Sequence, residues 1–296
     1  MRVALVTTSW PRFDGDPSGH FVEAEARALT RCGEDVVVIA ADGAAFGWPG
    51  VAARIEENPW RAASAAAWVV RARGEIARGR FDRVIAHWAV PCAWPIATGG
   101  RAGRALEVVS HGGDVRLVAR MPRVMRAHVV RTIARRVEAW RFVAAHLLDA
   151  IVSRVPSDVG RAVERVARVE ACAIEVDVPT PAAIEEKRAR VGTPFAVCVA
   201  RLVESKRVDA AIAWAARERV TLVVVGDGPS RPKLEARARE LGRELGARVV
   251  FVGKVPRDEA LAWIAASEGV VNASRVEGAS TVEREAMALG VAVRAI

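Results

Sequence analysis

The sequence has few of the features that mark secreted or membrane-spanning chains. Its 296 residues include only four cysteines, the widely spaced Cys32, Cys92, Cys172 and Cys198. This spacing predicts reduced, buried thiols rather than a disulfide framework or a zinc site. No apolar run approaches the length needed to cross a bilayer, and the N-terminus lacks the small-residue cleavage pattern of a secretory signal. We therefore expect a cytoplasmic protein.

Low-complexity tracts are also absent, and 52% of the residues are hydrophobic. A disordered chain could not bury so much apolar surface, so this composition predicts a folded globular protein. The length suffices for two domains of ordinary size, each with its own core.

Lysine is scarce, because the chain has four lysines against forty arginines, and the formal net charge is +9. Much of this charge lies between positions 115 and 141, where eight arginines accompany a single acid, Glu138. Such a cluster attracts anionic membranes, nucleic acids or phosphorylated ligands through the same Coulombic interaction. The charge by itself does not choose among these partners.

Short apolar runs alternate with longer helical patterns, which is typical of βαβ units around a mainly parallel sheet. Expected strands begin at Arg2, Asp35, Asp82, Ala105 and Trp140, and again at Pro194, Thr221, Arg248, Gly269 and Val291. We predict an α/β protein with two Rossmann-like, doubly wound domains facing each other across a cleft. They occupy residues 1–175 and 194–296, with a proline-punctuated linker at 176–193. Ligands should bind at the carboxyl ends of the strands.

Two cations follow the first expected strand of the second half. In "CVARLVESKR", Arg201 lies at the strand end and Lys206 at the opening of the next helix. A guanidinium fork and a compact ammonium can together hold a diphosphate, although two solvated surface cations would give the same pattern. The "GDGP" turn, Gly226 to Pro229, permits a close backbone approach, which we interpret as structural.

The stretch "SRVEGASTVEREAMALG", residues 274–290, predicts a helix whose N-terminus can bind an anion. Ser280 followed three positions later by Glu283 matches a capping box, which places the helix start near Thr281. The free amides at the end of such a helix attract an anion.

Two glutamates flank this helix start, Glu277 in the loop and Glu285 in the second helical turn. A side chain on a helix points back toward the N-terminus, so both carboxylates can reach a ligand bound there. Each could accept hydrogen bonds from neighbouring hydroxyls. A loop glutamate and a helical glutamate that only favours the helix dipole would be the structural explanation.

These segments together closely resemble glycosyltransferase family 4, retaining enzymes of the GT-B fold. The resemblance rests on "RLVESK", "GDGP", "FVGKVP" and "SRVEGASTVEREAMALGVAV", in this order and spacing. In the first half, "SGHFVEAEARALTRCGEDVVVIA" looks like the family's glycine loop and first helix, and "VVSHGGDVR" looks like its histidine loop. It extends over nearly the whole chain.

The resemblance implies a metal-independent, hexosyltransferase-like enzyme of polysaccharide or glycolipid biosynthesis. It would move a sugar from a UDP-sugar or GDP-sugar donor to a carbohydrate or lipid-linked acceptor, without a cofactor. Arg201 and Lys206 would bind the donor diphosphate and stabilise the charge that develops as the nucleotide leaves. Glu285 would hold the ribose hydroxyls, and the backbone near Lys254 and Val255 would contact the base.

Other implied roles concern the transferred sugar. Glu277 would engage this sugar together with nearby backbone amides. Those amides belong to Gly278, Ala279, Ser280 and Thr281. Gly19 would let the loop of the first domain approach the donor, and His111 would lie beside the reacting sugar. Alternatively, Gly19 only starts a helix and His111 only ends a strand.

The remaining histidines, His20, His87, His128 and His146, we interpret as structural, although His87 also lies at a strand end. We find no ligand cluster with a spacing suited to a metal. Trp10 and Trp88 could line an acceptor cleft, but large aromatic side chains more often belong to a core.

The arginine-rich segment also carries a helical apolar pattern. Met125, Val129, Ile133, Val137 and Trp140 recur at helical spacing, so we expect them to pack inward while the arginines stay solvated. Some relatives that work at membranes use a basic amphipathic helix in this domain. Peripheral docking of the Arg116–Arg141 segment on anionic lipid at the inner face of the membrane is therefore an alternative.

Three positions depart from the family pattern. The chain stops at Ile296, where relatives continue, so we expect an incomplete second domain. Glu175 stands where the family usually has a linker glycine, and Arg207 replaces a glycine that commonly follows the clamp lysine. A non-catalytic or weakly active nucleotide-sugar-binding protein is accordingly the alternative function. Nucleic-acid binding is disfavoured, since basic and aromatic residues do not interleave on an expected strand face.

Overall fold

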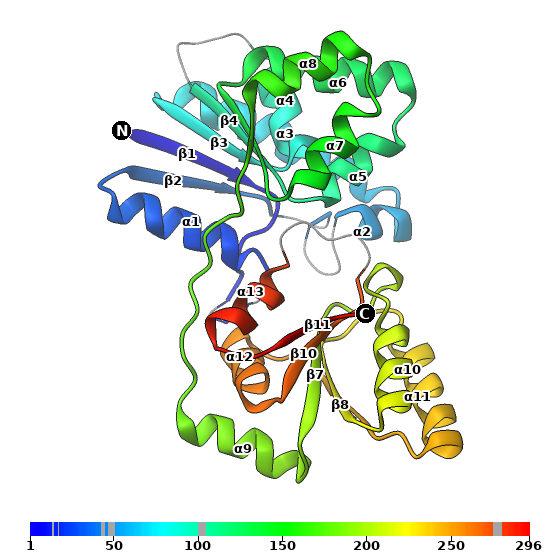
Figure 1. Cartoon of the computed structure of the whole chain (residues 1–296). Helices are drawn as coiled ribbons and strands as arrows, with labels where there is room; N and C mark the ends of the chain where they lie inside the picture. The colour runs from blue at the N-terminus through cyan, green and yellow to red at the C-terminus, as the bar shows by residue number, and fades with distance from the viewer. Residues whose placement is uncertain (14, 17, 43–44, 47–50, 100–104, 275–279) are drawn as a thin grey trace. The chain divides into compact units, whose positions relative to one another are not determined.

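The computed structural model describes residues 1–296 except 14, 17, 43–44, 47–50, 100–104 and 275–279 (Figure 1). Contacts divide the chain into two compact units. The first comprises Met1–Arg12 and Ser18–Ala173, and the second comprises Phe13–Pro17 and Ile174–Ile296. Each unit has its own parallel sheet.

The first unit is built on a six-stranded sheet. Its strands are β1 (Arg2–Thr7), β2 (Asp35–Ala40), β3 (Arg83–His87), β4 (Ala105–Ser110), β5 (Ala139–Phe142) and β6 (Ala167–Val169). The strand order is β2-β1-β3-β4-β5-β6, and every neighbouring pair is parallel. The chain adds β2 on one side of β1 and β3 to β6 on the other, which is the reversal of a doubly wound sheet.

Helices connect these strands. They are α1 (His20–Arg31), α2 (Val51–Glu57), α3 (Arg61–Arg78), η1 (Ala89–Ala93), α4 (Trp94–Ala97), α5 (Gly113–Arg120), α6 (Arg123–Arg136), α7 (Ala145–Val152) and α8 (Ser157–Val166). The central strand β1 shows why the sequence folds in this way. Val3, Ala4, Leu5 and Val6 are all fully buried, and such an uninterrupted apolar run suits a strand covered on both faces.

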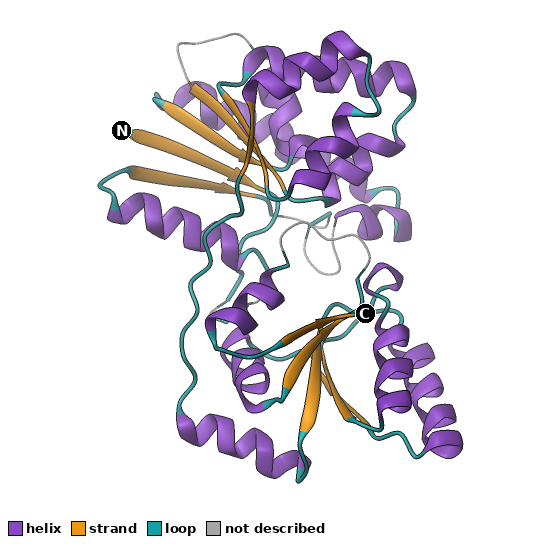
Figure 2. Ribbon diagram, in the orientation of Figure 1, coloured by secondary structure: helices purple, strands orange, loops and turns teal. Residues whose placement is uncertain are grey.

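The second unit has a five-stranded parallel sheet in the order β11-β10-β7-β8-β9. Its strands are β7 (Phe195–Val199), β8 (Thr221–Val225), β9 (Val249–Gly253), β10 (Gly269–Asn272) and β11 (Val293–Ala295). Its helices are α9 (Pro181–Val191), η2 (Glu204–Lys206), α10 (Val208–Glu218), α11 (Arg231–Leu245), α12 (Arg257–Ala266) and α13 (Thr281–Ala288). Figure 2 shows helices on both faces of this sheet.

Two apolar cores lie on the two faces of the second sheet. Ala196 and Cys198 of β7 pack with α10 and α11 on one face. Phe195 and Val197 of the same strand pack with residues of α9, α12 and α13 on the other. Alternate side chains of a strand point to opposite faces, so β7 contributes to both cores.

All ten expected strands are present, and β6 is an additional short strand that the sequence pattern did not indicate. Within the range 176–193, which we expected to be a linker, Pro181–Val191 forms the helix α9. Thr180 caps this helix by accepting a hydrogen bond from the Ala183 backbone N–H at 3.3 Å. The fading periodicity was misleading because α9 contributes few side chains to the core.

The expectation of four buried thiols was wrong at one position. Cys92, Cys172 and Cys198 are buried, whereas Cys32 is exposed at the C-terminal end of α1, and none of these four residues forms a disulfide. A thiol at a helix end on the surface has no neighbouring element to cover it.

The arginine-rich segment forms α5, α6 and the start of β5. Val129, Ile133, Val137 and Trp140 are buried as expected, but Met125 is 46% exposed, which corrects the apolar pattern at its first turn. The expectation that every arginine stays solvated was also wrong. Arg141 lies on β5, is buried, and forms ion pairs with carboxylates. None of the helices in the described part of the chain is long and apolar enough to cross a membrane.

Candidate functional site

The second sheet brings four predicted site segments to one edge. Arg201 follows β7, Gly226 follows β8, Lys254 follows β9, and α13 follows β10. Because these neighbouring strands are parallel, their carboxyl ends lie at the same edge of the sheet. In open α/β sheets this edge is where ligands bind.

The loop that carries Arg201 is held by the adjacent strand. The Ala200 N–H donates to the Val225 carbonyl at 3.0 Å, and the Leu202 N–H donates to the Asp227 carbonyl at 2.9 Å. Between these two anchors the Arg201 side chain is exposed. The backbone therefore holds this cation at the strand end.

Gly226 and Gly228 make that anchoring possible. A Cβ at Gly226 would lie 1.9 Å from the Ala200 carbonyl oxygen, and one at Gly228 would lie 2.5 Å from the Leu202 carbonyl oxygen. Any side chain there would push the Arg201 loop away. The structural interpretation of the GDGP turn is thus confirmed, and the turn acts by positioning its neighbour.

Lys206 ends the short helix η2 and is followed by a backbone turn at Arg207. Arg207 has φ 48° and ψ 41°, a left-handed conformation that glycine adopts freely and that costs other residues about 1–2 kcal/mol. This geometry explains why glycine suits the position. The Arg207 side chain adds a hydrogen bond to the Ala273 carbonyl at 3.3 Å, which ties this loop to the residue after β10.

Helix α13 begins at Thr281, as predicted. The Ser280 Oγ caps it by accepting a hydrogen bond from the Glu283 N–H at 3.3 Å. The Glu283 carboxylate accepts from the Asn272 side chain at 2.6 Å instead of completing the capping box. The predicted site residues Glu277, Gly278 and Ala279 lie outside the described residues.

Glu285 is a buried carboxylate on α13, with 6% of its surface exposed. Its Oε1 accepts from Arg257 Nε at 3.1 Å and forms an ion pair with Arg257 Nη2 at 3.0 Å. The same guanidinium donates to the Glu175 carbonyl. Arg257 therefore fixes the Glu285 carboxylate and joins it to the segment that enters the second unit. Sequence reasoning missed Arg257, although its place in the first turn of α12, after the strand β9, was a signal.

The loop after β9 is contacted by the early segment that belongs to the second unit. The Arg257 N–H donates to the Gly15 carbonyl at 2.9 Å. Lys254 Nζ lies 4.0 Å from the Asp16 carboxylate and 5.5 Å from the centre of the Phe13 ring. Val255 is half-buried and packs against the core of α12 and α13, so the base contact inferred for it stays a prediction.

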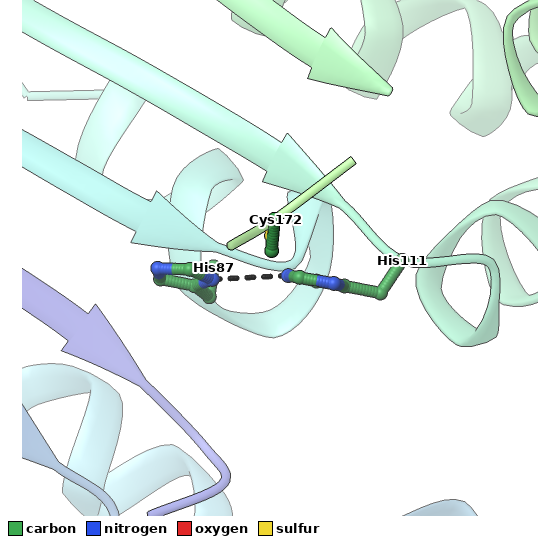
Figure 3. Close-up of side chains that lie close together, drawn as sticks. All are labelled: His87, His111 and Cys172. Atoms are coloured by element: carbon green, nitrogen blue, oxygen red, sulfur yellow. Dashed lines mark hydrogen bonds between the residues drawn. The ribbon is translucent and has the colours of Figure 1, made fainter. Parts of the chain in front are cut away.

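In the first unit, a histidine pair lies at the carboxyl ends of two adjacent strands. His87 is the last residue of β3, and His111 follows β4. Their rings lie nearly parallel, and His87 Nδ1 is 3.0 Å from His111 Nε2 (Figure 3). His87 is fully buried, whereas His111 is half-buried. His87, which we took as structural, is thus the direct partner of the predicted site residue.

One buried carboxylate fixes the backbone around this pair. Asp114 Oδ2 accepts from the Ala89 N–H at 2.8 Å, and its Oδ1 accepts from the His111 and Gly112 N–H groups at 3.1 Å. Burial raises the pKa of Asp114, while these backbone donors act in the opposite direction. The carboxylate links the residues after β3 to those after β4.

Charged residues surround His87 on its other side. Arg141 pairs with Glu25, and with Glu107 at 2.5 Å. Burial and the Arg141 charge lower the pKa of His87 to about 3. Burial, followed by the nearby His87 and Arg141, also lowers the pKa of His111. Both rings are therefore neutral near pH 7.

Among the described residues, Cys172 joins the two histidines in a group that could hold a metal ion. Its sulfur and one nitrogen of each ring all lie within 4.8 Å of one another (Figure 3). Sequence reasoning found no such cluster, because the three residues are far apart in the chain. The two ring nitrogens contact each other directly at 3.0 Å, however, which is the geometry of a hydrogen bond.

Phe21 and Trp88 pack against the His111 ring, and Gly19 precedes the helix α1 that carries Phe21. Gly19 precedes α1 with φ 78°, and a Cβ there would lie 2.4 Å from the Ser9 carbonyl oxygen. The rings of Phe21 and Trp88 each lie 4.9 Å from that of His111. Trp88 has φ 74°, which for such a bulky residue stores strain of about 1–3 kcal/mol.

Trp10 is partly buried against an apolar cluster that includes Leu5 and Val22, and Trp88 packs against the same cluster. Both tryptophans thus contribute to packing, as their size suggested. A role in lining an acceptor site stays a prediction.

Most of the second unit matches a known family model. Residues 180–295 match the family model described as Glycosyl transferases group 1. None of the curated proteins compared with the chain matches it.

Several solved structures share the fold of the whole chain. Anabaena HepE in complex with UDP has a TM-score of 0.67 at 17% identity, over 99% of this chain and 80% of that one. The catalytic domain of starch synthase IV from Arabidopsis thaliana, bound to ADP and acarbose, has a TM-score of 0.71 at 13% identity, over 99% and 82%. Sucrose-phosphate synthase from Thermosynechococcus elongatus has a TM-score of 0.65 at 17% identity, over 99% and 80%. The chain therefore has the α/β fold of GT-B proteins, with two parallel sheets, and the family match supports a glycosyltransferase.

Proposed function

We propose that this protein is a retaining glycosyltransferase of family 4, which moves a sugar from a nucleoside-diphosphate sugar to an acceptor hydroxyl. The observation that carries the proposal is the arrangement of the second sheet. Four segments with cations, glycines or a capped helix all follow parallel strands at one edge, within the range that matches the glycosyltransferase model. An anionic ligand bound at this edge would meet both the cations and the amides of α13.

In this mechanism the donor diphosphate binds Arg201, Lys206 and the N-terminus of α13. The bond between the anomeric carbon and the phosphate oxygen breaks, and its electron pair stays on the β-phosphate. The two cations and the helix amides stabilise this charge, which is greatest in the transition state. The acceptor oxygen then bonds to the anomeric carbon from the same face and passes its proton to a phosphate oxygen. No covalent enzyme intermediate and no metal are needed.

Glu285 would hold the ribose through its carboxylate. A carboxylate accepts strong hydrogen bonds from two neighbouring hydroxyls. The ion pair with Arg257 orients Glu285 in its buried place, which makes the carboxylate a defined acceptor. The base would lie against the backbone of Lys254 and Val255.

The donor nucleotide is best sought among uridine and guanosine diphosphate sugars. HepE is named as a complex with UDP, and with UDP-glucose in another structure, which supports testing uridine donors first. Thermal shift with each nucleotide sugar would detect binding, because a ligand stabilises the folded state by mass action. Hydrolysis and transfer assays would follow, with the anomeric configuration of the product read by NMR.

The outcomes separate the two functions considered. Donor-dependent product with the donor's anomeric configuration supports the proposal, and an inverted product contradicts retention. Saturable stabilisation by a donor without hydrolysis or transfer to any acceptor would instead identify a nucleotide-sugar-binding protein. Failure of every nucleotide sugar to stabilise the chain would contradict both.

The surface of α5 and α6 favours a second proposal, peripheral binding to an anionic membrane that carries a lipid-linked acceptor. Apolar side chains are exposed here between arginines: Leu117 is 42%, Met125 46% and Val124 83% exposed. Arg116, Arg120 and Arg123 are exposed on the same two helices. Apolar side chains ringed by cations suit the interface of an anionic bilayer, which for a cytoplasmic protein is the inner leaflet.

Vesicle sedimentation at low salt tests this second proposal. We expect the protein to bind vesicles of anionic phospholipid and not those of neutral phospholipid. The double variant Val124→Ser/Met125→Ser should lose binding that Val70→Ser retains, since Val70 is 72% exposed, between Met125 and Val124, but lies on α3. Equal sedimentation with both lipids would contradict the proposal.

A further inference from the structure

We propose that His87, together with Glu25, is a positioning pair that keeps the proton of His111 on Nε2, so that His111 Nδ1 accepts a hydrogen bond from a ligand hydroxyl. The sugar nature of that ligand rests on the proposed function. The proton position does not, because it follows from contacts within the first unit alone.

The contact between the two rings allows two arrangements. His87 Nδ1 and His111 Nε2 are 3.0 Å apart, so one nitrogen carries the proton and donates while the other accepts. If His87 donates, its Nε2 is unprotonated. If His111 donates, the Nε2 of His87 carries a proton and the Nδ1 of His111 is unprotonated.

Glu25 decides between these arrangements. Its Oε2 lies 3.8 Å from His87 Nε2, and both atoms are buried without a hydrogen-bond partner among the described residues. The other oxygen of Glu25 pairs with Arg141. A carboxylate facing a ring nitrogen favours a proton on that nitrogen, since two lone pairs would repel each other in a medium of low polarity. His87 Nε2 therefore carries the proton, His87 Nδ1 accepts, and His111 Nε2 donates.

The alternative with both rings protonated is excluded by their surroundings. Two imidazolium ions in contact would repel each other, and the buried Arg141 adds a third positive charge nearby. Burial, which disfavours a charged ring, is the largest cause of the lowered pKa of both rings, and the nearby positive charge acts in the same direction. A neutral pair with a single shared hydrogen bond is the stable form.

The surroundings also fix where the His111 ring lies. Asp114 binds the backbone N–H of His111, and Phe21 and Trp88 pack against its ring at 4.9 Å. Figure 3 shows the second nitrogen of His111 directed away from His87. His111 is half-buried as a residue, and we assign the ligand contact to this second nitrogen.

The protonation of His111 Nδ1 determines which ligand groups can form a hydrogen bond with it. It can accept from a hydroxyl group but cannot donate to a phosphate or carbonyl oxygen. Within the proposed function, the hydroxyl belongs to the transferred sugar. His111 would then discriminate sugars by the presence of a hydroxyl at one position.

Nitrogen-15 NMR of the imidazole rings tests the proton position directly in the full chain. The chain has five histidines, so the signals can be assigned with single His→Gln variants. We expect His111 to show a protonated Nε2 and an unprotonated Nδ1 at neutral pH, and His87 to show the same tautomer. A His111 ring protonated at Nδ1 would overturn the proposal.

Matched variants test the role of Glu25. Glu25→Gln removes the carboxylate that faces His87, and the Nε2-protonated population of His111 should fall. Glu107→Gln is the control. Glu107 also pairs with Arg141, but it lies on β4, whereas Glu25 lies on α1. Its spectrum should keep the wild-type tautomer. If both variants, or neither, changed the tautomer, Glu25 would not be the determinant.

Kinetics test the function of the pair. His87→Phe should lower kcat/KM for transfer by about 10-fold, the value of one lost hydrogen bond to the catalytic ring. His87→Asn, whose amide oxygen can replace Nδ1 as the acceptor, should recover activity to within about 3-fold. Equal losses in both variants, with both still folded by circular dichroism, would show a merely structural role.

Donor addition separates this proposal from the proposed function. A bound nucleotide sugar should shift the His111 Nδ1 signal toward that of a hydrogen-bonded acceptor, and the deoxy-sugar analogue lacking the contacted hydroxyl should not. An unchanged Nδ1 signal with donor bound would overturn the ligand contact. If no nucleotide sugar binds, the proposed function fails, while the free-protein spectra still decide the proton position.

Discussion

The two regions that carry candidate site residues are built in opposite ways. In the second unit, Arg201 is an exposed cation on a loop that backbone hydrogen bonds to β8 hold in place. In the first unit, His87 is enclosed by buried charges, and the pair of Arg141 with Glu25 joins residues 116 positions apart. An exposed cation contributes little to folding and is available to a ligand. A buried charge network must stay complete, or the fold loses stability.

This contrast predicts that similar substitutions have different consequences in the two units. Removing one member of a buried ion pair leaves its partner desolvated and uncompensated. Removing an exposed cation changes the free energy of unfolding little. It can, however, remove a positive charge that stabilises the transition state of the reaction. Stability and catalysis should therefore respond to different residues.

The largest effect is expected for Arg141→Leu, which leaves the buried Glu25 without its cation and leaves Glu107 with Arg83 alone. We expect the first unit to lose about 3–5 kcal/mol of unfolding free energy. The control Arg131→Leu removes an exposed pair with Asp158 and should cost less than about 1 kcal/mol. Urea unfolding, with hydrogen exchange of the β5 amides to locate the change, measures both. Equal losses would mean that the Arg141 network is not the stabilising feature.

Lys206→Met should affect activity instead. Without the ammonium, kcat should fall about 100–1000-fold, because the charge on the leaving phosphate is greatest in the transition state. The free energy of unfolding should change by less than about 0.5 kcal/mol. Lys233→Met, an exposed lysine on α11, is the matched control and should retain activity. A fall in donor affinity with kcat unchanged would contradict transition-state stabilisation.

The contrast also explains which features the sequence predicts. The strands of both sheets and the start of α13 are local features, since apolar runs and the Ser280 cap can be recognised within a few residues. The resemblance to a family likewise depends on contiguous motifs. Arg201, Lys206 and Glu285 were predicted in this way, and the structure places the segments that carry them after parallel strands at one edge of a sheet.

The histidine pair could not be predicted in the same way. His87, His111 and Cys172 lie in three separate segments of the chain. The pairing of β3 with β4 brings the two histidines together, and Cys172 comes from the last residues of the first unit. The burial of Arg141 was missed for a related reason, because the expected strand from Trp140 gives no sign of Glu25 and Glu107, the distant carboxylates that pair with this arginine. Long-range pairing decides both cases, and no short pattern encodes it.

The burial of His87 gives the first unit its own pH dependence. In the unfolded chain this histidine binds a proton near pH 6.5, whereas in the folded state its pKa is about 3. Between these values the unfolded state binds more protons, so stability falls as the pH is lowered. From pH 7.5 to 5 the loss due to His87 is about 2 kcal/mol.

The variant His87→Asn removes this titrating group. Its unfolding free energy should fall by about 2 kcal/mol less than that of the wild type over the same pH range. Hydrogen exchange of the β3 and β4 amides gives the local free energy at each pH. The control variant His146→Asn replaces an exposed histidine on α7, and the pH dependence of its unfolding free energy should equal that of the wild type. If the unfolding free energy of His87→Asn depended on pH as strongly as that of the wild type, His87 would not be the group that causes the pH dependence.

The smallest effect compares two helix caps within the second unit. Ser280 caps α13 and Thr180 caps α9, each by accepting one backbone hydrogen bond at 3.3 Å. Replacing either by alanine should lower local stability by about 1 kcal/mol, measured by hydrogen exchange at Glu283 and Ala183. Only Ser280→Ala should also raise the Kd for donor, because only the amides of α13 are proposed to bind phosphate. If both variants weakened donor binding equally, the effect would come from the general stability of the unit, and α13 would not be an anion site.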